Sequence, residues 1–162
     1  MIKTYTVVLA TGMTSSPLTR FIPGEYDEYG RLKVGRDLRV IGSEAVFAAG
    51  DTAHALADDI HPTYLSCQHA LELGRYAGHN ALHDLVGCEL IPYRQAFYAT
   101  CVDLGPWGAL FTTGWDREVR KTRHEGKAMK QQINNEWIYP PSPAIGKVEI
   151  FRHIALSAEI DT

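Results

Sequence analysis

A strand-like run that ends in a glycine and a carboxylate is the feature of this sequence with the clearest potential for chemistry. In the stretch "VFAAGDTAHA", four small or apolar residues lead directly into Gly50 and Asp51. Glycine lets a ligand approach the backbone, and a carboxylate at the carboxyl end of a strand accepts hydrogen bonds from ribose-like or ribityl hydroxyl groups. We therefore treat Asp51 as a candidate ligand anchor, with an ordinary surface turn as the alternative.

A long helical pattern follows this turn and runs from Pro62 to Gly87. Apolar residues recur there at helical steps, a proline suits the first turn, and a glycine suits the C-terminal stop. The first-turn amides of such a helix face whatever lies at its start, where the helix dipole favours negative charge or an electron-rich carbonyl. The small side chains of Ser66 and Cys67 allow a close approach at that point.

The remaining patterns predict an α/β chain. The run "TYTVVLA" (4–10) is typical of a strand covered on both faces, and "AVFAA" (45–49) of a second buried strand. Between them lies a glycine-rich connection in which "RLKV" and "LRVI" predict short strands. Two aromatic and β-branched runs around "DLGPWG" predict an antiparallel pair, and the pattern over 120–139 predicts a helix that ends at Pro140 and Pro141.

Composition and charge exclude several classes of protein. The chain has 162 residues, a formal net charge of -3 and 45% hydrophobic residues, values that suit one globular unit and give no reason to expect nucleic-acid binding. Its three cysteines are odd in number and lack C-x-x-C spacing, which argues against disulfides and zinc and favours a cytoplasmic location. No apolar run approaches the roughly 20 residues of a membrane span, and we expect no signal peptide.

Histidines and basic residues form two further groups. His79 and His83 have the i, i+4 spacing of metal ligands, but no H-E-x-x-H motif accompanies them, so we interpret the histidines of this region as surface residues and expect no metal site.

Basic residues cluster between 117 and 130, where a phosphate or an anionic membrane surface could bind. Acidic residues interrupt that cluster and favour a solvated face.

Three motifs, taken in order, are similar to a known family. "VVLATG", then "VFAAGD" about forty residues later, then a helix with "SCQHALELGRYAGHN" resemble the C-terminal half of FAD-dependent pyridine nucleotide oxidoreductases, in particular the type II NADH dehydrogenase-like branch. The resemblance implies that the A-T-G triplet lines FAD, that the G-D pair holds its ribityl chain, and that the helix points its N-terminus at the flavin ring. The cofactor-binding residues it implies are Ala10, Thr11, Gly12, Gly50, Asp51, Ser66, Cys67 and Gln68.

The resemblance also implies a domain organisation and an activity. Residues 1–90 are expected to be the C-terminal part of a three-layer FAD-binding domain, 91–141 a small antiparallel α+β module, and 142–162 a tail. The family transfers electrons from NAD(P)H through FAD to a quinone-like acceptor. The G-x-G-x-x-G loops that bind pyrophosphate occur nowhere in this sequence, so we expect a truncated chain that is inactive alone. The alternative is a non-catalytic, self-associating remnant without cofactor.

An uncovered first strand and helix face would promote self-association. Gly74 and Gly78 predict tight packing against another backbone, the alternative being glycines that the helix tolerates. We expect a homo-oligomer, with exchanged elements as one way to form it. The resemblance also implies that full-length members of this family can make peripheral contact with a membrane.

Overall fold

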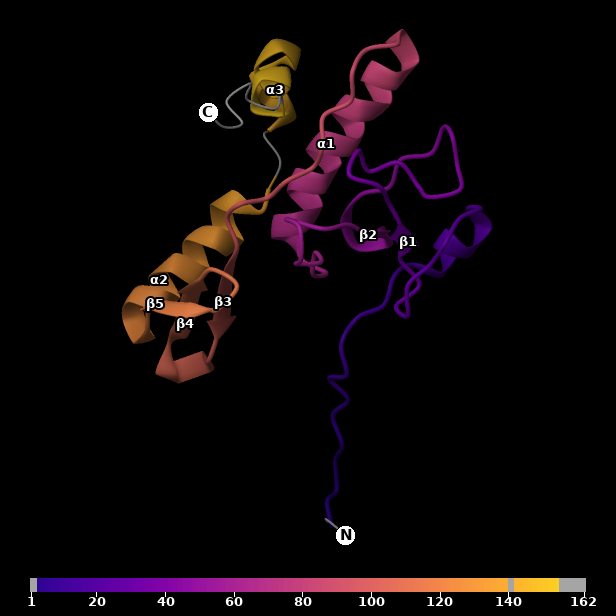
Figure 1. Cartoon of the computed structure of the whole chain (residues 1–162). Coiled ribbons are helices and arrows are strands. Elements are labelled where there is room, and N and C mark those ends of the chain that lie inside the picture. Colours follow the sequence, from indigo (N-terminus) through magenta and orange to yellow (C-terminus); the bar gives the residue numbers. More distant parts are fainter. Residues whose placement is uncertain (1–2, 140–141, 155–162) are drawn as a thin grey trace.

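The computed structural model describes residues 3–139 and 142–154 (Figure 1). The α-helices and strands, in chain order, are β1 Leu32–Lys33, β2 Ala53–His54, α1 Cys67–Val86, β3 Ala99–Asp103, β4 Ala109–Thr113, β5 Glu118–Lys121, α2 Arg123–Gln132 and α3 Lys147–Ile154. Short 3₁₀ turns lie at Pro17–Phe21, Gly50–Thr52, Gly105–Trp107 and Pro143–Ile145, and a π-helical segment, η4, at Ile133–Trp137. The chain is mixed α/β, as the sequence predicts.

The first sheet is a two-stranded parallel pair, β1 with β2, in which Leu32 lies opposite Ala53. A buried polar cluster fixes it: Arg31 donates from Nε to Asp27 Oδ2 at 2.6 Å and from Nη1 to the Thr63 carbonyl at 2.7 Å. Burial raises the pKa of Asp27, but hydrogen bonds from Arg31 and His54 outweigh this effect and lower the pKa below its ordinary value. The hydrogen bond from Arg31 to Thr63 thus joins the connection before β1 to the loop before α1.

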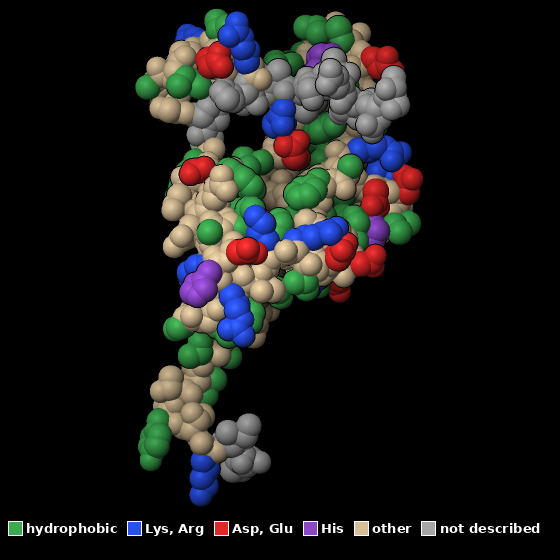
Figure 2. Space-filling model, turned by 90° about the vertical axis from the view of Figure 1, so that its left-hand side faces the viewer, with side chains coloured by type: hydrophobic (Ala, Val, Ile, Leu, Met, Phe, Trp, Pro, Cys, Tyr) green, Lys and Arg blue, Asp and Glu red, His purple; other side chains and the backbone are tan. Residues whose placement is uncertain are grey.

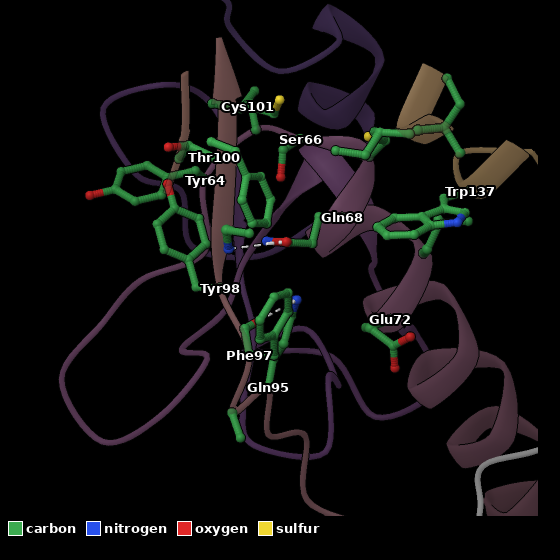
Figure 3. Close-up of a pocket in the computed structure, with 18 of the residues that line it drawn as sticks. Tyr64, Ser66, Gln68, Glu72, Gln95, Phe97, Tyr98, Thr100, Cys101 and Trp137 are labelled. Atoms are coloured by element: carbon green, nitrogen blue, oxygen red, sulfur yellow. Dashed lines mark hydrogen bonds between the residues drawn. The ribbon is translucent and has the colours of Figure 1, made fainter. Parts of the chain in front are cut away.

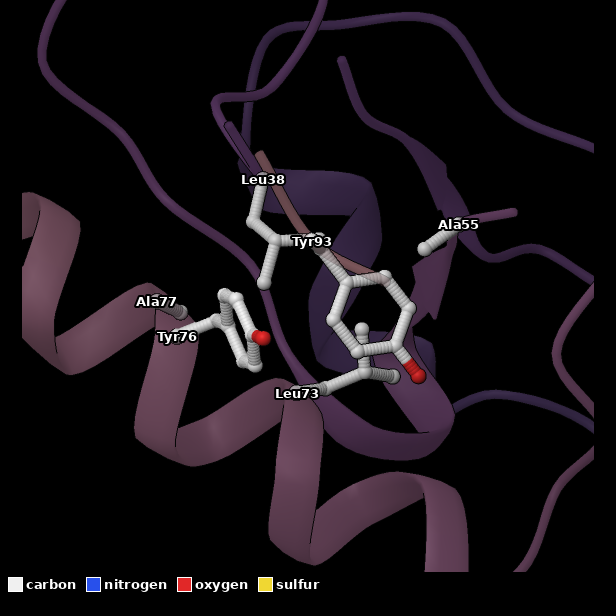
Figure 4. Packing of buried hydrophobic residues seen from close by; sticks show 6 residues of the cluster. All are labelled: Leu38, Ala55, Leu73, Tyr76, Ala77 and Tyr93. Carbon is white, nitrogen blue, oxygen red and sulfur yellow. The ribbon is translucent and has the colours of Figure 1, made fainter. Parts of the chain in front are cut away.

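The main core lies between α1 and this sheet (Figure 4). Its buried residues are Leu38, Ala55, Leu73, Tyr76, Ala77 and Tyr93. Tyr76 and Tyr93 meet edge to face with their ring centroids 5.3 Å apart, an arrangement that aromatic pairs favour. Because α1 buries one face here, the position of its first turn is fixed relative to the Gly50–Thr52 turn.

Helix α1 begins five residues later than its pattern predicts. Its N-cap is Ser66, whose side chain accepts a hydrogen bond from the His69 amide, and Gly87 ends it in the left-handed conformation with φ of 70°. Pro62 instead pairs with Leu56 in an isolated antiparallel bridge. The predicted C-terminal stop is confirmed and the predicted start is wrong, because a serine cap determines the first turn.

The predicted strand over residues 4–10 is wrong. This segment has no regular secondary structure, and Tyr5, Val7, Val8 and Leu9 are largely exposed. It projects from the body of the molecule (Figures 1 and 2). A strand needs a neighbour to pair its backbone groups, and no described segment supplies one here. The predicted strand over 45–49 is reduced to one bridge, between Phe47 and Arg39.

The second part of the chain is a three-stranded antiparallel sheet, in the order β3-β4-β5, covered by α2. The predicted pair around "DLGPWG" is confirmed in β3 and β4, whereas β5 was not predicted and takes up Arg120 and Lys121 from the start of the predicted helix. The predicted helix over 120–139 is α2 followed by η4, and its predicted stop at Pro140 and Pro141 lies outside the described residues. Helix α3 begins at Lys147, in the predicted tail.

Candidate functional site

The Gly-Asp turn packs directly against the first turns of α1. Gly50 has φ of +67°, and a Cβ added to it would lie 3.5 Å from the Ala70 Cβ. A side chain at this position would therefore be strained by the backbone, and its Cβ would be in van der Waals contact with the helix. Asp51 follows in the same 3₁₀ turn, with an exposed side chain that makes no ion pair or side-chain hydrogen bond within the described part of the chain. Its carboxylate is free to accept hydrogen bonds from a ligand.

The structure brings together only part of the predicted cofactor set. Gly50 and Asp51 lie beside the helix that begins with Cys67 and Gln68. Ala10, Thr11 and Gly12 lie instead in the exposed N-terminal segment, and a Cβ added to Gly12 would meet nothing within 4 Å. The triplet has left-handed geometry at its glycine, φ +100°, but it lines no site within the described residues.

A large apolar pocket opens on the other side of the α1 N-terminus, between the helix and the antiparallel module (Figure 3). Its volume is about 800 Å³. It is lined by Tyr64, Leu65, Ser66, Cys67, Gln68, Leu71, Glu72, Arg94, Gln95, Ala96, Phe97, Tyr98, Ala99, Thr100, Cys101, Phe111, Lys130, Ile133, Trp137 and Ile138. A cavity of this size with mainly aromatic and aliphatic walls and a few polar groups is typical of a site for a small organic ligand.

Gln68 is the polar group best placed to select a ligand in this pocket. Its Oε1 accepts a hydrogen bond from the Ala99 amide at 3.2 Å, which directs the side chain from α1 toward β3 (Figure 3). Its Nε2 is buried and has no hydrogen-bond partner among the described residues. An unpaired buried amide costs free energy unless a ligand accepts from it. Gln68 can therefore donate to a carbonyl oxygen that enters the pocket.

The two thiols of the pocket differ in their surroundings. Cys67 is exposed at the first position of α1, whereas Cys101 is half-buried on β3, where burial raises the pKa of its thiol. Both are free.

The far wall of the pocket belongs to the π-helical segment η4. Ile133 and Trp137 lie four residues apart on it and both line the pocket, with Trp137 across from Tyr98 in Figure 3. From the sequence, these residues were predicted only to belong to a helix over 120–139. A π-helical turn widens the backbone and often marks a functional site.

A cluster of aromatic rings packs against Tyr98, one of the residues that line the pocket. The rings of His61 and Trp115 are stacked 4.3 Å apart, Trp115 and Tyr98 are also 4.3 Å apart, and Tyr98 and His69 are 5.6 Å apart, all with interplanar angles of 13° or less. His69 is 1% exposed, so the interpretation of these histidines as surface residues is wrong for it. Burial lowers the pKa of His69, and its hydrogen bond to Gln95 opposes that shift.

The other histidine pair forms no metal site within residues 3–139 and 142–154, where no group of three or more potential ligands occurs. The His79 and His83 rings lie 3.8 Å apart, and His83 Nδ1 donates to the Glu89 carbonyl at 2.8 Å. Burial and the nearby His83 lower the pKa of His79.

Sequence reasoning identified one side of the site and missed the other. It selected the Gly-Asp turn and the start of α1 from local motifs. It missed Tyr98, Phe111 and Trp137, because their spacing is equally typical of ordinary strands and helices. The only local signal was the density of aromatic residues between 93 and 115.

Comparison with known proteins shows what this chain is similar to. No protein-family model matches the chain. Its sequence is nevertheless homologous to NADH dehydrogenase-like proteins, which confirms the resemblance stated above. Relatives from two strains of Mycobacterium tuberculosis carry that name, and each is 48% identical over 136 residues, which cover 84% of this chain and 34% of the relative. A demethylphylloquinone reductase of a Synechocystis strain is 30% identical over 108 residues, or 65% of this chain and 26% of the relative.

The chain spans about a third of the length of these Mycobacterium tuberculosis relatives. Within the described ranges, no helix is long and apolar enough to cross a membrane.

Proposed function

We propose that this chain carries the flavin-facing turn and the acceptor pocket of an NADH dehydrogenase-like oxidoreductase. In the complete reaction, electrons pass from NAD(P)H through FAD to a quinone-like acceptor. The observation that carries the proposal is the apolar pocket at the start of α1, with the unpartnered Gln68 amide in its wall. We also propose a cytoplasmic location, as the reduced cysteines suggest.

One part of the predicted cofactor-binding set is placed where it would hold FAD. Gly50 and Asp51 form a cradle that excludes side chains and offers a free carboxylate, which would hold ribityl hydroxyls. The first-turn amides of α1, at Cys67 and Gln68, would lie near the flavin ring. When bound, the flavin supplies the redox chemistry by accepting a hydride and passing electrons on. Because the sequence has no G-x-G-x-x-G loop, we propose that the chain alone binds no NADH.

The pocket fits a planar, largely apolar acceptor with a carbonyl group. Aromatic walls favour a flat ring, Gln68 would donate to its carbonyl oxygen, and the pocket mouth carries the charged residues Glu72, Arg94 and Lys130. One relative is named as a reductase of a phylloquinone-type molecule, which supports this class of acceptor for the proposed site.

A visible absorbance spectrum tests the flavin half of the proposal. The purified chain is mixed with FAD, washed free of excess cofactor, and compared with an Asp51→Ala variant. We expect a retained, shifted flavin band in the wild type and about tenfold weaker retention in the variant, since one charge-assisted hydrogen bond is removed. Asp116→Ala, at another exposed position, is the matched control. Equal retention in Asp51→Ala and wild type would mean that Asp51 is not the ribityl anchor.

A second candidate function is a non-catalytic, self-associating chain without cofactor. It is favoured by the exposure of Tyr5, Val7, Val8 and Leu9, which are 73% to 109% exposed. Such a β-branched, apolar run is a template for pairing with another copy of the chain. A colourless protein after washing, together with an oligomer in solution, would favour this candidate.

A further inference from the structure

The acceptor pocket is a gap between two parts of the chain. One wall is formed by the first two turns of α1, Ser66 to Glu72, and the other by β3, α2 and η4 of the antiparallel module. The shape of the pocket therefore depends on what holds the module at a fixed distance from α1. The hydrogen bond from the Ala99 amide to Gln68 is one such contact.

The second connection is the stack of four nearly parallel rings. Its members come from four segments: His61 from the loop after β2, Trp115 from the turn between β4 and β5, Tyr98 from the residue before β3, and His69 from the first turn of α1. Two of them, Tyr98 and Trp115, belong to the module, and the two histidines belong to the part that contains α1. The stack therefore crosses the boundary twice.

Both ends of the stack are fixed by hydrogen bonds. His61 Nδ1 lies 2.7 Å from Asp58 Oδ2, and the Ile60 and His61 amides donate to the other oxygen of Asp58. His69 Nδ1 lies 2.8 Å from Gln95 Oε1, which also accepts from Tyr93 Oη at 2.7 Å. Rings held in this way cannot turn freely, so each presents one fixed face to its neighbour.

Trp115 occupies the central position. It stacks on His61 with an interplanar angle of 2° and on Tyr98 with an angle of 13°. The turn that carries it is also tied to Tyr98 through the backbone, because the Gly114 amide donates to the Tyr98 carbonyl at 2.8 Å. Tyr98 lines the pocket, whereas Trp115 and His61 do not. Trp115 can therefore act on the pocket through Tyr98 and through Tyr64, a lining residue whose ring centroid lies 6.0 Å from that of Trp115.

We propose that Trp115 is a positioning residue for the acceptor pocket. Clamped between His61 and Tyr98, it holds the Tyr98 ring as a fixed wall and keeps the module at the distance from α1 that a flat acceptor requires. The inference rests on the proposed function for the identity of the ligand, but the clamp itself is a property of the chain. Removing Trp115 frees Tyr98 to rotate and loosens the module.

The test measures binding of menadione, a small naphthoquinone, to the full chain through quenching of its tryptophan fluorescence, to which Trp137 in the pocket contributes in every variant. The cysteines are replaced by serine for this measurement, because free thiols add covalently to the quinone. We expect Trp115→Ala to weaken binding about tenfold, because two stacked ring pairs are lost. Trp115→Phe, which keeps a stacking face, should restore most of the affinity. Trp107→Ala is the matched control, because Trp107 lies in the same module but stacks under Arg123 and does not line the pocket.

A second readout needs no ligand. In a background with Cys67→Ser and Cys88→Ser, the rate of maleimide labelling at Cys101 reports how open the pocket is. Trp115→Ala should raise that rate several-fold, and Trp115→Phe and Trp107→Ala should not. If Trp115→Ala does not fold, as judged by circular dichroism, Trp115→Leu keeps the apolar volume without a stacking face and carries the same expectation.

The outcomes separate the two proposals. Faster Cys101 labelling in Trp115→Ala, with no menadione binding by any variant, would support the clamp and count against a quinone-like acceptor. Menadione binding by the wild type, with affinity and labelling both unchanged in Trp115→Ala and Trp115→Leu, would overturn the role of Trp115.

Discussion

At the scale of single residues, the site depends on polar groups that the fold leaves without partners. The Asp51 carboxylate has no ion pair in the described part of the chain, and Gln68 Nε2 is buried there without an acceptor. Leaving a buried donor unpaired costs about 1 to 3 kcal/mol, so such groups in a pocket wall indicate a place for a ligand atom. His69 Nε2 is a third such atom, but it lies behind the pocket wall.

Buried His69 predicts a dependence of stability on pH. Burial lowers the pKa of folded His69, so as the pH falls the unfolded chain binds this proton first. The contribution to stability is therefore complete above about pH 6.5, the unfolded value, and declines as the pH falls from there through the folded pKa. Urea unfolding of the wild type and His69→Gln between about pH 8 and pH 5 measures this effect.

The expected result is a steeper loss of unfolding free energy at acidic pH in the wild type than in His69→Gln. His124→Gln, at an exposed position of α2, should keep the wild-type slope. Identical slopes for the wild type and His69→Gln would show that His69 takes up its proton equally well in both states.

At the scale of elements, the glycines of α1 and α2 have opposite surroundings. Gly126 in α2 is buried against β4, and a Cβ added to it would lie 2.2 Å from the Ala109 carbonyl oxygen. Gly78 in α1 faces open space, with nothing within 4 Å of an added Cβ. The same is true of Gly74, so the prediction that these two glycines of α1 pack against another backbone is wrong within this chain.

These environments predict stability changes of opposite sign. Gly126→Ala should lower the unfolding free energy by about 2 kcal/mol, because the clash involves backbone that cannot move without separating α2 from β4. Gly78→Ala should raise it by up to about 1 kcal/mol, because alanine loses less conformational entropy in a helix. Denaturant unfolding of both variants checks the pair. A neutral Gly126→Ala would mean that α2 does not lie against β4 as described.

At the scale of the whole molecule, the chain combines a packed centre with unusually exposed apolar elements. The N-terminal segment and the last turns of α1 are the clearest cases: Tyr5, Val8, Leu82, Leu85 and Val86 are 64% to 109% exposed. Surfaces of this kind are covered in most proteins by another part of the chain or by a partner. The chain spans about a third of the length of the Mycobacterium tuberculosis relatives.

Self-association of this chain is the prediction that belongs to this scale. We expect light scattering at micromolar concentration to report a species larger than a monomer, because the segment 5–9 can pair with a strand of a second copy. Val8→Lys places a charge in that segment and should shift the population toward monomer, whereas Thr14→Lys, outside the segment, should not. A clean monomer of the wild-type chain would contradict the proposed homo-oligomer.

The sequence by itself determined the local features of this protein. Gly87 set the C-terminal end of α1, aromatic and β-branched residues set β3 and β4, and the motif order set the relationship to NADH dehydrogenase-like proteins, because each of these depends on residues that are close together in the chain. Only the tertiary structure decided the rest. The segment 4–10 has the composition of a strand but no neighbour to pair with, and the pocket joins Gln68 to Tyr98 and Trp137 across long stretches of sequence. Strand pairing and pocket formation depend on which segments of the chain meet in the folded molecule. Local sequence patterns do not specify this.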